Sequence, residues 1–139
     1  MKYLTIFFTL LLSSCFCFAG VRSASDLKAD CEIYIRQEDN GKKTFDSVAE
    51  GYASVRCLNY VMGWADATQF SPFVGEGNKQ WYLQFSDGVT PDQIVRVFVK
   101  FVEENPTWLN KDAPTALIQS VAKPGLILKY PVIPAPVSN

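Results

Sequence analysis

Cysteines are the residues in this sequence whose type and number most directly predict chemistry. The chain holds four cysteines and no histidine. Cys15 and Cys17 fall within the expected N-terminal leader, residues 1–19, which leaves Cys31 and Cys57 for the rest of the chain. Two cysteines without CxxC spacing do not supply the four ligands of a tetrahedral zinc ion, so we expect no metal site. An even count of cysteines is typical of disulfides in exported proteins, and we predict one bond between Cys31 and Cys57.

The lack of histidine argues against an enzyme. It removes Ser-His-Asp and Cys-His nucleophile activation and most zinc hydrolase designs. Carboxylates remain as candidates, but we expect them on solvated helix faces or at helix caps: Asp66, Asp87, Asp92, Glu103 and Glu104. No glycine-rich phosphate loop is present either. We therefore predict no catalytic residue and no cofactor.

Charge argues against nucleic acid as a partner. Lys and Arg number 13 against 14 Asp and Glu, for a net charge of −1. No basic block stands out, whereas nucleic-acid-binding domains usually carry one.

The N-terminal residues have the pattern of a secretory signal peptide. Lys2 precedes an apolar run over residues 4–12, which is too short to span a bilayer. Cleavage after Ala19 would place small residues, Cys17 and Ala19, in the two positions that signal peptidase inspects. We therefore expect residues 1–19 to be removed and residues 20–139 to form one domain in the periplasm.

Two other interpretations of the N-terminus remain open. Leu12-Ser13-Ser14-Cys15 looks like a lipobox, in which Cys15 would be lipidated, and the apolar run could also be a membrane anchor. We favour cleavage over lipidation because the residues behind Cys15 continue the apolar run. Beyond Val21 no segment approaches the roughly 20 apolar residues of a transmembrane helix, so we expect no membrane span in the mature chain.

Apolar spacing predicts two helices in the first half of the domain. The first follows residues 23–26, with Ser25 or Asp26 as its N-cap. Its apolar positions are Leu27, Cys31, Tyr34 and Ile35. A longer helix is expected over about 46–68, and Gly63 within it indicates close approach of another helix. Its broad apolar face would consist of Val48, Tyr52, Val55, Leu58, Val61, Met62 and Trp64.

The second half carries the clearest helix signal. Thr90 suits an N-cap, Pro91 the first helical position, and Gln93 a capping box. The inward stripe of this helix is expected to be Ile94, Val97, Phe98, Phe101 and Val102, with Asn105-Pro106 as its end. A last helix is expected over about 112–122. The proline-spaced tail from residue 126 should be extended, either packed on the body or loose. The fold class is therefore all-α: a small single-domain bundle of about four helices with one disulfide and an extended C-terminal tail.

An aromatic-rich connection, residues 70–87, separates the second and third expected helices. We name it the aromatic segment, and its rings are Phe73, Trp81, Tyr82 and Phe85. Exposed Trp and Tyr side chains often dominate protein interfaces, so this segment is a candidate partner-binding surface. The alternative is that the rings cover the core, and binding would then involve the helix faces around Arg96, Lys100 and Glu103.

Several motifs together resemble the Rap/Tai immunity proteins of type VI secretion systems. They are a cysteine on a first short helix, the segment over residues 57–67, Gly88-Val89-Thr90-Pro91-Asp92-Gln93-Ile94-Val95, and Phe101-Val102-Glu103-Glu104-Asn105-Pro106. The resemblance covers roughly residues 27–122. It implies a helical bundle, export to the periplasm, a homodimer, and neutralisation of a secreted peptidoglycan amidase by occlusion of its active site. An envelope protein of the same fold with a different ligand and no effector partner is the alternative.

One departure from the family pattern concerns cysteines. Many members of the family that this chain resembles carry a second pair of cysteines. One cysteine of that pair stands before the Gly-Val-Thr motif and the other after the last helix. Here residues 81–87 and 122–125 contain no cysteine. The extended tail could take over the clamping role of that bond.

The N-terminal prediction is tested by mass. Protein recovered from the cell envelope should give an intact mass that begins at Gly20 and includes no lipid, because signal peptidase acts after small residues. A mass matching a diacylated chain beginning at Cys15 would instead establish a lipoprotein.

Overall fold

Four α-helices and a small sheet make up the part of the protein that the computed structural model describes, residues 21–41, 45–70, 73–74, 80–122 and 124–131. The helices are α2 (Ala24–Asp39), α3 (Val48–Phe70), α4 (Pro91–Glu104) and α5 (Ala113–Ala122), with a 3-10 helix, η2 (Pro106–Asn110), between α4 and α5. The predicted bundle of four helices with one disulfide is confirmed.

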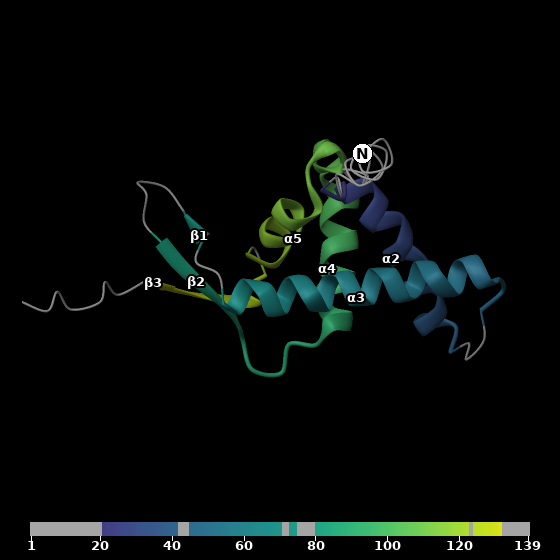
Figure 1. Ribbon diagram of the computed structural model, residues 1–139, viewed down its shortest axis with the longest axis horizontal. Coiled ribbons are helices and arrows are strands. Elements are labelled where there is room, and N and C mark those ends of the chain that lie inside the picture. The colour runs from purple at the N-terminus through teal and green to yellow at the C-terminus, as the bar shows by residue number, and fades with distance from the viewer. Residues whose placement is uncertain (1–20, 42–44, 71–72, 75–79, 123, 132–139) are drawn as a thin grey trace, which may run out of the picture.

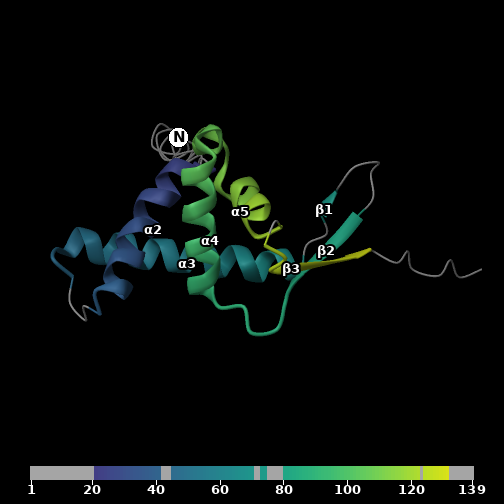
Figure 2. The ribbon, with the colours of Figure 1, turned by 180° about the vertical axis from the view of Figure 1, so that it is seen from behind.

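The longest helix, α3, crosses the whole body. The helices α2, α4 and α5 lie on one side of it, and the strands continue from its C-terminal end (Figure 1). Seen from behind, α4 runs across α3 between α2 and α5 (Figure 2). The core lies between these helices, and its largest fully buried side chains include Leu27, Val61, Phe98 and Leu117.

The N-cap of α2 lies two residues before the earlier of the two caps that the sequence predicts. Ser23 is the N-cap, and its hydroxyl accepts a hydrogen bond from the backbone N–H of Asp26. The expected caps, Ser25 and Asp26, lie within the helix. The start is set by tertiary pairing, because the Ala24 N–H donates to the carbonyl of Lys111 at 2.8 Å. Such long-range pairing overrides a local capping preference.

The start of α4 agrees with its sequence signal. Thr90 and Gln93 form the capping box, in which each side chain accepts from the other's backbone N–H. In the predicted stripe Ile94, Phe98, Phe101 and Val102 are buried, and Val97 is half-buried. Val95 and Val99 are buried as well, because α4 packs against three other helices.

The predicted apolar face of α3 is wrong in part: Val61 and Trp64 are buried as expected, whereas four of its other members face outward. Its buried residues are Ala53, Ser54, Cys57, Val61, Trp64 and Thr68. Val48, Tyr52, Val55 and Met62 are exposed. The physical reason is that the disulfide turns the Cys57 side of α3 toward α2, and the apolar residues on the opposite side then face outward.

Gly63 also differs from expectation. A Cβ atom built at this glycine would meet nothing within 4 Å in the described chain. The close approach of another helix that the sequence indicates is therefore not made by the described part of this molecule.

Three antiparallel strands form a sheet of order β1-β2-β3 at the C-terminal end of α3. They are β1 (Phe73–Val74), β2 (Gln80–Phe85) and β3 (Ile127–Pro131). The extended tail thus packs on the body through residues 127–131, with Tyr82 opposite Tyr130 and Phe85 opposite Ile127. Residues 132–139 lie outside the described part. Residues 1–19, for which the sequence predicts a signal peptide, do as well.

The predicted disulfide joins α2 to α3. Cys31 and Cys57 are both fully buried, and their Cα atoms are 5.0 Å apart. The bond closes a loop with a sequence separation of 26 residues, which the unfolded chain would otherwise explore freely.

Reduction of this bond should destabilise the fold by about 3 kcal/mol, because a loop of this length gains chain entropy when it opens. For a domain of this size the melting temperature should fall by about 10 °C. The measurement is thermal unfolding with and without reductant. The double variant Cys31→Ser/Cys57→Ser should melt like the reduced protein and show no response to reductant. A wild-type protein with both thiols free after purification would contradict the assignment.

Candidate partner-binding surface

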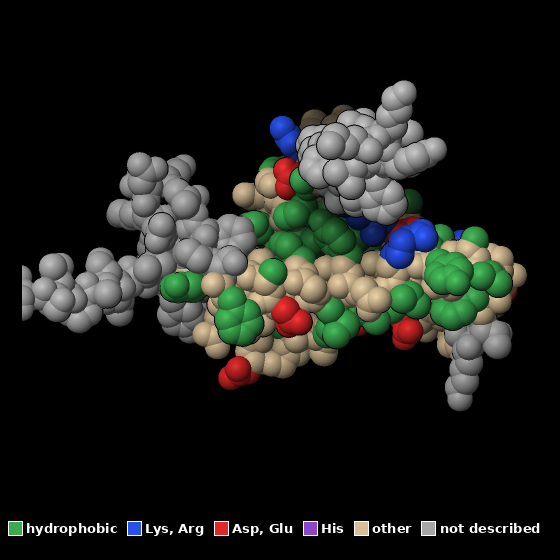
Figure 3. Space-filling view, in the orientation of Figure 1, with side chains coloured by type: hydrophobic (Ala, Val, Ile, Leu, Met, Phe, Trp, Pro, Cys, Tyr) green, Lys and Arg blue, Asp and Glu red, His purple; other side chains and the backbone are tan. Residues whose placement is uncertain are grey.

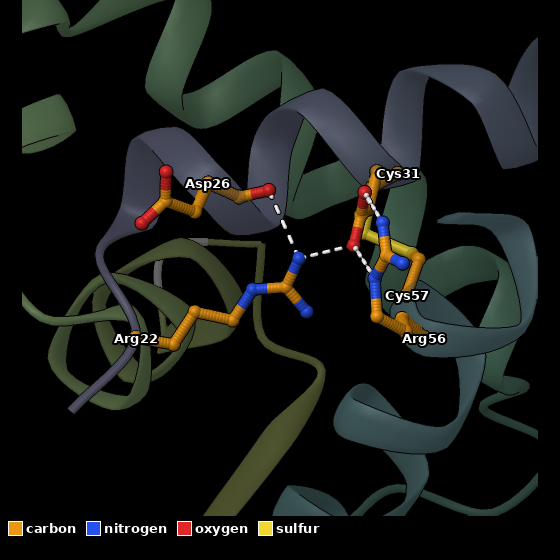
Figure 4. The surroundings of a disulfide bond; sticks show 6 residues. Arg22, Asp26, Cys31, Arg56 and Cys57 are labelled. Atoms are coloured by element: carbon orange, nitrogen blue, oxygen red, sulfur yellow. Dashed lines mark hydrogen bonds and ion pairs between the residues drawn. A yellow bond between two sulfur atoms is a disulfide. The ribbon is translucent and has the colours of Figure 1, made fainter. Parts of the chain in front are cut away.

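A buried acidic group lies directly beside the disulfide. Asp30 precedes Cys31 on α2 and is 7% exposed. Two hydrogen bonds of 2.8 Å reach its carboxylate from the guanidinium of Arg56, the residue before Cys57. Arg22 donates to the same carboxylate and to the carbonyl of Asp26 (Figure 4). The carboxylate of Asp30 on α2 therefore binds both Arg22, which precedes α2, and Arg56 on α3.

The pKa of the Asp30 carboxyl group is shifted by these contacts. Burial raises the pKa of the carboxyl group, but hydrogen bonds and charge from Arg56 and Arg22 outweigh burial and leave the pKa below its ordinary value. A buried carboxylate with both partners in place is fully satisfied. Asp30 accordingly has a structural role, since its carboxylate is held by protein groups.

The aromatic segment forms part of the sheet. Tyr82 and Phe85 lie on β2, with Tyr82 exposed and Phe85 half-buried. The ring of Phe85 meets the ring of Trp64 edge-on, with centroids 5.9 Å apart. Phe73 pairs with Trp81 in the backbone ladder between β1 and β2, whereas the side chains of these two residues lie outside the described part.

Alternation along β2 decides which side chains can meet a partner. Leu83 is buried, whereas Tyr82 and Gln84 on either side of it are exposed. Successive side chains of a strand point to opposite faces, so Tyr82 and Gln84 share the outer face. Of the two predicted rings whose side chains are described, Tyr82 is available to a partner, and Phe85 mainly packs against the body.

A shallow hollow of about 180 Å³ adjoins Phe85 where the sheet meets α3 and α4. Its lining is mostly apolar and consists of Met62, Ala65, Asp66, Gln69, Phe85, Val89, Pro91 and Ile94. No local pattern predicts the contribution from α3, because these residues lie beside Phe85 only in the folded chain.

A second hollow, of about 400 Å³, lies where α3 faces the start of α5. It is lined by Asn59, Tyr60, Gly63, Trp64 and Pro114. The indole Nε1 of Trp64 is buried and has no hydrogen-bond partner among the described residues. An unpaired buried donor is uncommon in native proteins, and sequence reasoning did not single out this atom.

The alternative surface named from the sequence is a groove between α2 and α4. Its volume is about 370 Å³, and its lining combines apolar and charged side chains: Glu32, Ile35, Arg36, Arg96, Val99, Lys100 and Glu103. Hydrogen bonds from Arg96 to Asp39 (2.7 Å) and Asp92 (2.9 Å) raise the pKa of this guanidinium. Arg96 is thus already engaged, whereas Lys100 makes a looser ion pair with Glu104, at 3.9 Å.

The described residues contain neither a metal site nor a membrane-spanning helix. No group of three or more Asp, Glu, Cys or His side chains there could hold a metal ion. In the same residues, no helix has the length and apolar character needed to cross a membrane.

Comparison with known proteins decides the family. The model of the Rap1a immunity proteins matches residues 23–124, which cover most of the chain. This protein belongs to the Rap1a immunity protein family. No curated protein and no solved structure matches the chain. Membership of the Rap1a family indicates neutralisation of an effector, and it supports the immunity part of the sequence resemblance.

The carboxylate of Asp30 gives a pH-dependent prediction. Because the pKa of Asp30 is lower in the folded state than its ordinary value, its stabilising contribution is complete above about pH 5 and is lost as the pH falls through the folded pKa. Asp30→Asn should lower the free energy of unfolding at pH 7 by about 1–3 kcal/mol, the usual range for hydrogen bonds to a charged group.

The free energy of unfolding of the wild type and of Asp30→Asn is measured by urea unfolding at a series of pH values between pH 7 and pH 2. The two stabilities should converge toward the acid end. Asp87→Asn, which changes an exposed carboxylate, is the control and should track the wild type throughout. A constant gap between wild type and Asp30→Asn at every pH would contradict the ion-pair explanation.

Proposed function

We propose that this Rap1a family member neutralises a peptidoglycan-cleaving amidase delivered by a type VI secretion system, and that it does so by occluding the active site of that enzyme. The observation that carries the proposal is the family match over residues 23–124. The motif resemblance supplies the amidase, the secretion system and the homodimer, which are parts of the same proposal.

The place of action in the proposal is the periplasm. The leader over residues 1–19 would direct export, after which residues 20–139 fold as the binding domain. The buried Cys31–Cys57 bond supports this location, because structural disulfides persist in oxidising compartments. The lipoprotein alternative at Cys15 would place the same domain on a membrane surface.

The proposed inhibitory surface is the outer face of the sheet in the aromatic segment. β2 is the central strand and is hydrogen-bonded on both sides, so its backbone is held firmly. Tyr82 projects from this strand on the exposed side. A rigidly mounted tyrosine supplies large contact area at a small entropic cost, as in many interface hot spots.

The test begins with the gene neighbourhood, where the proposal predicts a small secreted amidase encoded beside this gene, and continues with that amidase, purified separately. The mature protein should bind it and stop its cleavage of peptidoglycan. Tyr82→Ala should weaken binding by about 2 kcal/mol, roughly 30-fold in Kd, with little change in melting temperature, because this side chain lies on the outer face. Calorimetric titration and thermal unfolding give the two values.

Lys100→Ala is the matched control, since it truncates an exposed side chain in the α2–α4 groove. It should bind like the wild type. If Lys100→Ala weakens binding while Tyr82→Ala does not, the inhibitory surface lies between α2 and α4. If Tyr82→Ala unfolds the protein, this ring is structural. A wild-type protein that neither binds nor inhibits the neighbouring amidase would contradict the proposed function.

A further inference from the structure

The hollow between α3 and the start of α5 has the character of a binding site. Its volume is about 400 Å³, and its lining consists of Asn59, Tyr60, Gly63, Trp64 and Pro114. In Figure 3 hydrophobic side chains gather in the recess above α3. Ligand sites are typically concave and mostly apolar, with a few polar groups that fix the ligand. None of the five lining residues is charged, so an uncharged occupant fits the hollow.

Trp64 brings a hydrogen-bond donor without an acceptor to this hollow. Its side chain is 9% exposed, and its Nε1 atom has no partner among the described residues. An indole N–H can only donate, and a buried one usually has an acceptor. The ring of Phe85, 5.9 Å away between centroids, packs against Trp64 but offers no such acceptor. The missing partner is therefore a group such as a backbone carbonyl.

Gly63 leaves room for that partner beside Trp64. A Cβ atom built at this glycine would meet nothing within 4 Å in the described chain. Because Nε1 is itself buried, the indole must turn toward this open space to donate to an acceptor in the hollow.

Tyr60 provides a second donor at the same hollow. Burial raises the pKa of its phenol above the ordinary value, Asp112 raises it further, and Arg22 partly offsets them. The phenol therefore stays protonated at neutral pH and can donate a hydrogen bond. The guanidinium of Arg22 lies 5.6 Å from the centre of the ring, a cation–π contact that helps to hold the ring in place.

An extended, proline-rich segment has the groups that this hollow lacks. Polyproline II segments make no internal hydrogen bonds, so their carbonyls are free to accept, and they bind to aromatic side chains in many recognition sites. The C-terminal tail has this composition, since it includes Pro131-Val132-Ile133-Pro134-Ala135-Pro136-Val137. No residue from 131 to 139 is charged, which matches the uncharged lining.

We propose that the tail beyond β3, residues 132–139, folds back into the hollow of the same molecule, where a carbonyl of its proline-rich part accepts the hydrogen bond from Trp64. The strand β3 begins at Ile127, opposite Phe85, and runs about 13 Å to Pro131. Residues 132–139 span about 25 Å as polyproline II, roughly twice that length. The tail is thus long enough to return, and its tether gives it a high effective concentration at the hollow.

The indole N–H signals in the NMR spectrum of the mature, oxidised protein test this contact without any effector. The chain has three tryptophans, and the signal lost in Trp64→Phe identifies Trp64. Deletion of residues 132–139 should shift this signal upfield, because a hydrogen bond to a carbonyl holds it downfield. The signal of Trp108, identified in the same way, is the control and should stay in place. A peptide of residues 131–139, added to the truncated protein, should restore the downfield position saturably.

Variants of the hollow should weaken binding of that peptide. Gly63→Leu fills the open space without meeting described atoms and should weaken binding by more than about 10-fold. Trp64→Phe keeps a ring but removes the donor, and about fivefold weaker binding is expected for one neutral hydrogen bond. Ala67→Leu adds the same side chain at an exposed position of α3 outside the hollow, and it should bind the peptide like the wild type.

Two results would overturn the inference. One is a Trp64 signal that does not move on truncation. The other is a signal whose position depends on protein concentration, because the tail of a second copy would then occupy the hollow. The truncation remains informative if Gly63→Leu folds poorly, since it leaves β3 intact. Neither result bears on amidase binding, which calorimetry measures separately.

Discussion

The bond between Cys31 and Cys57 fixes the rotation of α3 about its own axis. Once Cys57 points at α2, helical geometry assigns every other residue of α3 to a side. Val61 and Trp64 then enter the core, and Val55 and Met62 face outward. The neighbouring hydrogen bonds from Arg56 to Asp30 act in the same direction, because they join the two helices one residue away from the bond. The outward apolar side of α3 follows from this orientation.

The positions of the helices along the chain could be predicted from the sequence, but the buried side of α3 and the start of α2 could not. Local signals were sufficient for α4, where the Thr90 capping box and the Pro106 stop are encoded within a few residues. They failed for α3, because a helix with apolar residues on two sides does not reveal which side is buried. The start of α2 was also missed, since it depends on pairing between Ala24 and Lys111, far apart in sequence.

In the candidate site, too, features encoded locally could be predicted, whereas features that depend on long-range packing could not. The disulfide followed from cysteine counting, and the aromatic segment was recognised by composition. Its division into an outward Tyr82 and a body-facing Phe85 required the pairing of β2 with β3, whose partners Phe85 and Ile127 are distant in the chain. The hollow beside Phe85 and the unpaired Nε1 of Trp64 are likewise products of long-range packing, which no local pattern encodes.

The β2–β3 ladder lies where the family resemblance would place a second disulfide. Ser86 N–H donates to the carbonyl of Leu126 at 3.0 Å, and the Ser86 hydroxyl donates to the carbonyl of Gly125, so hydrogen bonds join the neighbourhoods of the two segments that lack those cysteines. A ladder of this kind also creates sheet edges, and unpaired edges invite other chains to add strands. Here β1 is only two residues long. β3 ends at Pro131, and Pro134 and Pro136 follow it in sequence; none of these prolines has an N–H to donate. The sheet can therefore present Tyr82 at the surface and still be a poor template for aggregation.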